Sequence, residues 1–123
     1  MEAVLCSIGM ANKEPGKADV LQGTLDLMVL HTVSTLGPMH GYAIAARLEQ
    51  VSGGSLQLNM GTLYPGLMRL EQRGLVRAAW GVTENNRKAR FYSISAAGRR
   101  RLTTEKAEWE RMTSIMHALL REG

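Results

Sequence analysis

Residues 59–76 read NMGTLYPGLMRLEQRGLV, a predicted helix that ends where a strand begins. Steps of four and three separate three leucines, which therefore lie on one face of a helix: Leu63, Leu67 and Leu70. Gly74 ends the helix, because glycine readily adopts the left-handed conformation found just after helix C-termini. The leucine face is predicted to enter the core, and the opposite face stays free for a partner.

Pro65 limits where this helix begins. Proline lacks a backbone N–H, so it is tolerated in the first turn, where that group has no partner in any case. The helix therefore begins between Asn59 and Leu63, either near Thr62 or earlier with a kink at the proline. Both starts agree with the pattern.

A first helix is predicted from Gln22, with Thr24 as a candidate N-cap and Asp26 in the first turn, where the helix dipole favours an acid. Its apolar positions recur at steps of three and four: Leu25, Met28, Val29, Val33 and Leu36. Gly37 and Pro38 end it. A second helix is predicted from about His40-Gly41 to Val51, and His40 is expected to support its start. One face of this helix is apolar and consists of Ile44, Leu48 and Val51.

Two strands follow the glycine, over Leu75–Trp80 and Ala89–Ser95, and the connection between them is rich in turn-forming residues. They form an antiparallel hairpin whose tip, residues 85–88, is polar and basic. Ser95 then caps a final helix of about 25 residues, roughly 37 Å long. Its apolar residues repeat as a heptad seam that a second copy of the chain is expected to cover: Leu102, Trp109, Met112, Met116 and Leu119.

This order of elements defines a mostly α fold with a small antiparallel β-hairpin. It is the order of a winged helix-turn-helix followed by a long C-terminal dimerisation helix. We expect three parts: a flexible N-terminal segment over 1–20, the winged helix-turn-helix over 21–95, and the dimerisation helix over 96–123.

Charge is unevenly distributed along the 123 residues, which carry a net charge of +4. Residues 61–101 contain nine basic and two acidic side chains, so this segment alone has a net charge of +7. A polyanion-binding surface has this footprint, although a solvated basic face does too. The single cysteine, Cys6, excludes an intrachain disulfide, and no apolar run reaches the length of about 18 residues that a membrane span needs.

The basic and polar side chains of the third helix and the hairpin are the candidate DNA contacts, since arginine can form paired bonds to guanine and basic hairpins reach phosphates. They are Asn59, Thr62, Tyr64, Arg69, Arg73, Arg87, Lys88 and Arg90. For Tyr64 we favour a phosphate contact over packing beneath the hairpin. His31, His40 and His117 lie too far apart to suggest a metal site, and no cofactor motif or acid–base pair of an enzyme is present.

Several motifs together resemble the PadR family of bacterial transcriptional regulators. They are Leu25–Leu36, His40-Gly41-Tyr42, Gly61-Thr62-Leu63-Tyr64-Pro65, Leu70-Glu71, Gly74-Leu75-Val76, and the stretch from Arg90 to Gly98. The resemblance covers about residues 21–120. It implies a homodimeric regulator, usually a repressor, that binds a palindromic operator with Gly61–Arg73 in the major groove. For some members it also implies a planar aromatic effector held by a tryptophan placed like Trp109.

We therefore expect a sequence-specific, DNA-binding transcriptional regulator that acts as a homodimer in the cytoplasm, without catalytic activity, metal, cofactor or membrane. For Trp109 we favour a place in the dimer core over a role as a ligand platform. Two alternatives use the same fold. One is a protein-interaction module in which the basic face is incidental, and the other is a binder of structured RNA.

Overall fold

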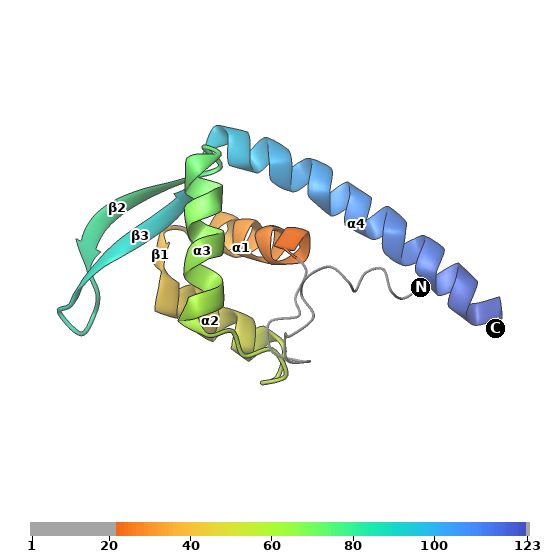
Figure 1. The fold of residues 1–123 in the computed structure, drawn as a ribbon, viewed down its shortest axis with the longest axis horizontal. Coiled ribbons are helices and arrows are strands. Elements are labelled where there is room, and N and C mark those ends of the chain that lie inside the picture. Colours follow the sequence, from red (N-terminus) through yellow and green to blue (C-terminus); the bar gives the residue numbers. More distant parts are fainter. Residues whose placement is uncertain (1–21, 123) are drawn as a thin grey trace.

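The computed structural model describes residues 22–122, which form a helical core with a projecting hairpin and a long last helix (Figure 1). The elements are α1 (Gln22–Leu36), β1 (Met39–His40), α2 (Gly41–Val51), α3 (Met60–Gln72), β2 (Val76–Val82), β3 (Lys88–Ile94) and α4 (Ala96–Glu122). The predicted class, mostly α with a small antiparallel sheet, is confirmed. The segment expected to be flexible, 1–20, lies outside the described residues together with Cys6.

One core joins α1, α2, α3 and the root of the sheet. Its fully buried members include Val29, Leu30, Val33, Ile44, Leu63, Leu67, Leu70 and Val76. The leucine stripe of α3 is therefore buried as predicted. Leu36 and Val51 were expected on buried faces but are exposed. Each is the last residue of its helix and lies past the neighbouring elements that cover the rest of the apolar face.

The start of α1 differs from the prediction. The helix begins at Gln22, so Thr24 lies inside its first turn and is not the N-cap, and Asp26 lies beyond the first turn. Asp26 therefore does not act on the helix dipole. It is buried instead and faces α3, where it meets two arginines.

Asn59 fixes the start of α3, because its Oδ1 accepts a hydrogen bond of 2.9 Å from the backbone N–H of Thr62. Pro65 is consequently the sixth residue of the helix, past the first turn, and the start near Thr62 is wrong. The helix continues through the proline to Gln72 and loses only the hydrogen bond that this residue cannot donate.

The hairpin of β2 and β3 is joined by a third, two-residue strand that was not predicted. The sheet order is β1-β3-β2, with Met39 opposite Tyr92 and His40 opposite Phe91. In the hairpin, the pairing runs from Val76 opposite Ile94 to Val82 opposite Lys88. His40 also supports α2, since its Nδ1 accepts from the backbone N–H of Ala43 at 3.3 Å, which confirms the role expected for it.

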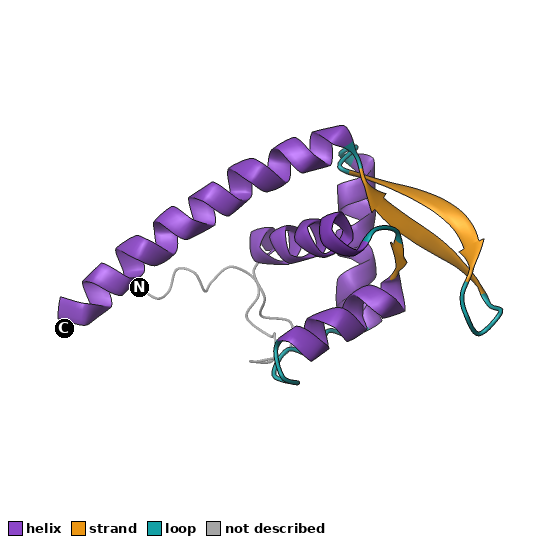
Figure 2. Ribbon diagram, turned by 180° about the vertical axis from the view of Figure 1, so that it is seen from behind, coloured by secondary structure: helices purple, strands orange, loops and turns teal. Residues whose placement is uncertain are grey.

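Ser95 caps α4 as predicted: its Oγ accepts from the N–H of Gly98 at 3.0 Å and donates to the Gly74 carbonyl at 2.7 Å. The first turns of α4 pack on the sheet and on α1, whereas the distal half extends beyond the core (Figure 2). Leu102 is half-buried against the core of its own chain, so it is only partly free for a partner. The remaining seam residues are exposed: Trp109, Met112, Met116 and Leu119.

Candidate nucleic-acid interface

The face of α3 that points away from the core is largely uncharged. Its exposed side chains are those of Tyr64, Pro65, Met68 and Gln72. Thr62 is half-buried in the first turn, and the side chain of Asn59 is engaged as the N-cap. Asn59 and Thr62 were both candidate DNA contacts at the start of the helix. Asn59 therefore has a structural role as the N-cap, which the sequence pattern alone does not distinguish from a DNA contact.

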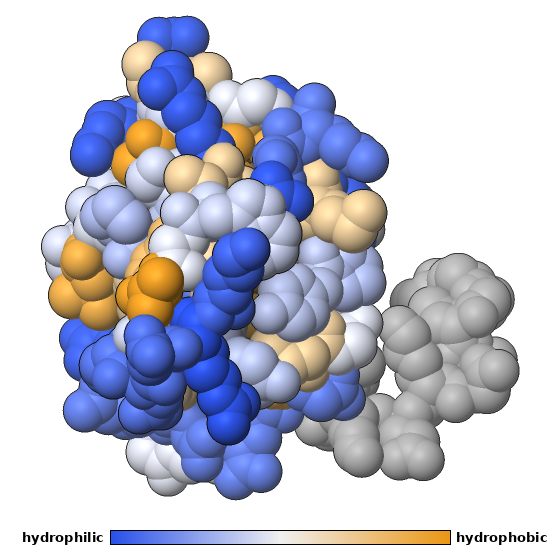
Figure 3. Space-filling model, turned by 90° about the vertical axis from the view of Figure 1, so that its left-hand side faces the viewer, coloured by the Kyte–Doolittle hydropathy of each residue, from blue (hydrophilic) through white to orange (hydrophobic). Residues whose placement is uncertain are grey.

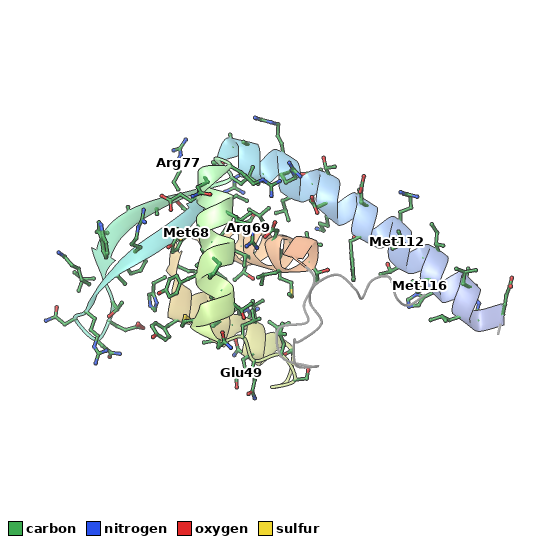
Figure 4. The ribbon with its side chains drawn as sticks, in the orientation of Figure 1. Glu49, Met68, Arg69, Arg77, Met112 and Met116 are labelled. Carbon is green, nitrogen blue, oxygen red and sulfur yellow. The ribbon has the colours of Figure 1, made fainter. Side chains whose placement is uncertain are left out.

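Arg69 and Arg73 lie on the flank of α3 that faces α1, and Figure 4 shows Arg69 on that side. Nη2 of Arg69 is 4.0 Å from Oδ1 of Asp26, and Nη1 of Arg73 is 3.5 Å from Oδ2. The arginine side chains are 35% and 43% exposed, and that of Asp26 is 12% exposed. Both arginines were expected on or beside the outer face of α3. They lie beside it, because both form ion pairs with the Asp26 carboxylate of α1.

The carboxyl group of Asp26 is almost completely shielded from solvent. Burial raises the pKa of its carboxyl group, and the charges of Arg69 and Arg73 oppose that rise without cancelling it. Among the described residues, no donor forms a hydrogen bond to Oδ1 of Asp26, and no acceptor receives one from Nε–H of Arg69. This cluster joins α1 to α3 through charge, with incomplete hydrogen bonding.

The hairpin brings basic side chains beside an exposed indole. Nη2 of Arg90 donates a 2.9 Å hydrogen bond to Oε2 of Glu71, which ties β3 to the last turns of α3. Nζ of Lys88 and Cζ of Arg90 each lie 5.9 Å from the centroid of the Trp80 ring, within the range of cation–π contacts. Arg87 and Lys88 are exposed, as predicted for the hairpin tip.

Backbone hydrogen bonds shape the tip. Oγ1 of Thr83 accepts from the N–H groups of Asn85 and Arg87 at 3.2 Å each. Asn86 adopts a φ of 61°, a left-handed conformation that asparagine tolerates better than most residues. The turn therefore holds the loop in a defined shape and leaves the Arg87 side chain in solvent.

A groove of about 710 Å³ separates the inner face of the hairpin from the first turns of α2 and α3. Its main lining residues are Tyr42, Tyr64, Trp80, Arg87, Lys88 and Arg90. Glu84 also lines it, so three basic groups face one acid. Figure 3 views the molecule from the hairpin side, and this face is mainly hydrophilic with separate apolar spots. Positive charge and phenol groups in one groove suit a phosphate backbone.

Tyr64 packs on the start of α2, a position not considered from the sequence, and its phosphate contact stays a prediction. Its ring packs on the start of α2, where a Cβ on Gly41 would lie 3.1 Å from Oη, and the side chain remains 39% exposed along the groove. Gly41 is thus needed for this close approach. The packing orients the phenol toward the groove, where a phosphate contact is geometrically open to it.

Tyr42 and Trp80 line the same groove but were not among the predicted site residues. Trp80 follows Val76 and Ala78 at alternate positions of β2, and this alternation alone assigns it to the buried face of the sheet. The strand instead extends past the core, so the same face becomes exposed at Trp80. The sequence does not show how far β2 extends past the core, and that information was needed to predict that Trp80 is exposed.

A second, apolar surface lies on the other side of the molecule. A groove of about 490 Å³ runs between α1, the end of α2 and α4, and its apolar lining includes Leu27, Met28, Leu36, Val51, Leu56 and Trp109. The exposed residues beyond it on α4 continue this apolar surface: Met112, Ile115, Met116, Leu119 and Leu120. Figure 4 shows Met112 and Met116 on the part of α4 that extends past the core.

Helices α2 and α3, the hairpin behind them and the basic groove between define a winged helix-turn-helix DNA-binding protein. The family described as "Transcriptional regulator PadR-like family" matches residues 29–104. The chain belongs to this PadR family, and it is a DNA-binding transcriptional regulator, not an enzyme. Among residues 22–122, none of the helices has the length and apolar character that crossing a membrane requires.

Solved structures agree with this assignment. A PadR family transcriptional regulator from Eggerthella lenta is 27% identical, with a TM-score of 0.70 over 83% of this chain and 86% of that one. A PadR-like transcriptional regulator from Bacillus cereus has the same fold, with a TM-score of 0.71 at 24% identity over 82% and 95% of the two chains. "Uncharacterized protein X" of Lysinibacillus sphaericus is 27% identical over 107 residues, which are 87% of this chain and 96% of that protein.

Proposed function

We propose that the protein is a cytoplasmic homodimer that binds a palindromic operator and represses transcription from it. The observation that carries this proposal is the groove between hairpin and helices, because three basic side chains gather there beside the free face of α3. The exposed face of α3 enters the major groove, and one sugar–phosphate strand lies between the hairpin and the first turns of α2 and α3.

The charges divide the work between the two elements. Arg87 and Lys88 are exposed at the tip and neutralise phosphates, while Arg90 is held by its hydrogen bond to Glu71 of α3. Arg69 and Arg73 keep their ion pairs with Asp26 and contribute less to affinity than their position in α3 suggests. Binding should weaken steeply as salt rises, because each neutralised phosphate releases counterions.

The apolar surface of α4 supports a dimer. Trp109, Met112 and Met116 form an exposed apolar surface of a kind that monomeric domains usually bury. The groove between α1, α2 and α4 provides an apolar surface against which the same residues of a second copy can pack. A partner's α4 fits there through the heptad seam. Two-fold symmetry then presents two α3 helices to successive major grooves, about 34–36 Å apart, and makes the operator palindromic. The family resemblance places a small aromatic effector, where a member binds one, between the two C-terminal helices, which makes Trp109 the candidate contact for it here.

The test is a fluorescence-anisotropy titration of duplex DNA from the promoter of the protein's own operon, over a series of salt concentrations. Replacing both Arg87 and Lys88 with alanine should reduce the slope of log K against log salt by about two. Arg77→Ala is the matched control, because this exposed arginine lies on the same hairpin but points to the opposite face of the sheet from Trp80 (Figure 4).

Three outcomes separate the alternatives. Absence of duplex binding by a folded dimer, even at low salt, would exclude the proposal and favour the protein-interaction module. Preference for duplex RNA over duplex DNA in competition would favour the RNA alternative. A promoter-reporter assay that shows higher expression in the presence of the protein would exclude repression and leave the DNA-binding role intact.

A further inference from the structure

Trp80 is the largest exposed aromatic side chain of the hairpin, with 67% of its surface in solvent. It lies on the sheet face that is buried against the core at Val76 and Tyr92. Farther along, the same face turns into the wall of the groove opposite α2 and α3. An indole in this position is costly to hydrate, and exposed apolar groups of this kind commonly mark a contact surface.

Neighbouring side chains hold the indole in place. Arg90 is directly opposite Trp80 across the ladder, and Lys88 is the next residue on that face of β3. Both cationic groups lie 5.9 Å from the ring centroid, and Arg90 is anchored in turn to Glu71 of α3. The indole is therefore positioned before any ligand arrives, with two positive charges beside it.

We propose that Trp80 packs against the sugar–phosphate backbone of bound duplex DNA. This inference rests on the proposed function and adds a contact that is not ionic. The apolar ring face covers a deoxyribose, and the indole N–H can donate to a phosphate oxygen, since it is a donor only. Lys88 and Arg90 beside the ring supply the charge complement for the phosphates on either side of that sugar.

The chemistry of the groove favours a backbone over other occupants. Tyr42 and Tyr64 on the facing wall add hydroxyl donors, and Glu84 is outnumbered by basic groups. A protein partner with an acidic surface would pair with the basic groups. The mixture of aromatic and basic side chains along this open groove instead matches the alternating sugars and phosphates of a DNA backbone. Because bases remain stacked inside a duplex, the contact is independent of sequence and should act on operator and non-operator DNA alike.

The experiment compares wild type with Trp80→Ala and Trp80→Phe, using a fluorescein-labelled duplex of about 30 base pairs that spans two successive major grooves. Trp80→Ala should weaken binding about tenfold, in the range seen for interface aromatics, with an unchanged salt slope. Trp80→Phe should recover part of the affinity because it keeps an apolar ring. Lys88→Ala is the contrasting variant, and it should lower the slope by about one.

A second readout uses the indole itself. The chain has two tryptophans, so subtracting the emission of Trp80→Phe from that of wild type isolates the signal of Trp80 without changing Trp109. Saturating unlabelled duplex should then change the emission of Trp80. This measurement also covers the case in which Trp80→Ala fails to fold.

Each result has a defined meaning. Wild-type affinity in Trp80→Ala, or unchanged emission from Trp80 at saturation, would overturn the proposal while the regulator assignment stands. A salt slope that falls in Trp80→Ala would also overturn it, because the indole would then act only by placing the cations. If wild type binds no duplex, the proposed function fails and this inference fails with it.

Discussion

Gly98→Ala should be among the most damaging small substitutions in the chain. Gly98 is the buried residue of α4, and a Cβ built on it would lie 2.1 Å from the Leu75 carbonyl oxygen and 2.7 Å from Cγ1 of Ile94. One of these neighbours is backbone and cannot rotate away. The root of α4 must therefore move by about 1 Å, and that movement strains the bonds of Ser95 to Leu75 and Gly74.

The magnitude follows from three contributions. Forcing extra volume into a packed site costs about 1–3 kcal/mol. Two strained hydrogen bonds add about 1 kcal/mol each. Alanine in place of glycine returns about 1 kcal/mol of helix propensity. The free energy of unfolding should fall by roughly 2–4 kcal/mol, which lowers Tm by on the order of 10–20 °C for a domain of this size.

The assay is thermal unfolding by circular dichroism at one fixed protein concentration, because an oligomer's Tm depends on concentration. Gly23→Ala is the matched control: it also lies in a helix, but a Cβ there meets no atom of residues 22–122 within 4 Å, so stability should stay level or rise. A Gly98→Ala Tm within about 3 °C of wild type, which is well under 1 kcal/mol, would refute the close-packing argument.

The same variant tests the geometry of the proposed dimer. Helix α4 is about 40 Å long, so a displaced root shifts its far end and the spacing between the two α3 helices. Below its Tm, folded Gly98→Ala should lose operator affinity more than affinity for random duplex, because only the operator demands the spacing of successive grooves. Equal losses on both duplexes would exclude this effect on spacing.

Three further predictions concern charge and the α4 surface. Burial raises the pKa of Asp26, so its ionised form disfavours the folded state: the benefit of the protonated form is present at acidic pH and is lost as pH rises through the raised pKa. Asp26→Asn should therefore match or exceed wild-type stability in urea at neutral pH, with the difference vanishing in acid, and a loss of about 3–5 kcal/mol would mean that the ion pairs dominate. Replacing Trp109 and Met116 with alanine should shift sedimentation toward the monomer, and a persistently tight dimer would rule out the seam. Replacing Arg69 and Arg73 with alanine should weaken DNA binding less than the double substitution at the hairpin tip, and a larger loss in anisotropy titrations would show that DNA displaces Asp26.

Local periodicity accounts for the parts of the fold that were predicted. The leucine stripe of α3 and the seam of α4 each rest on apolar residues separated by three, four or seven positions, the spacing of one helix face. By contrast, β1 has two residues and forms only because β3 lies beside it, so it has no pattern of its own. The start of α3 was left open for a related reason: burial of its leucine face compensates for the hydrogen bond missing at Pro65, and a local rule does not include that packing.

The candidate site was predicted less well because its arrangement depends on contacts between distant residues. Arg69 meets Asp26 across 43 positions of sequence, and Arg90 meets Glu71 across 19. Both arginines were predicted as DNA contacts from a charge count, which treats every arginine as unpaired, and those contacts stay predictions. Trp80 was not among the predicted site residues, because the sequence does not show that β2 extends past the edge of the core and exposes this side chain.

In the proposed complex, DNA affinity and recognition of the base sequence depend on different residues. The exposed residues of α3 that face the major groove, Tyr64, Pro65, Met68 and Gln72, are uncharged, whereas the free cations lie on the hairpin. Loss of hairpin charge should therefore weaken binding to all duplexes alike and leave the ranking of sequences unchanged. Changes at Met68 or Gln72 should instead alter that ranking with the salt slope preserved, because these side chains meet base edges without neutralising phosphates.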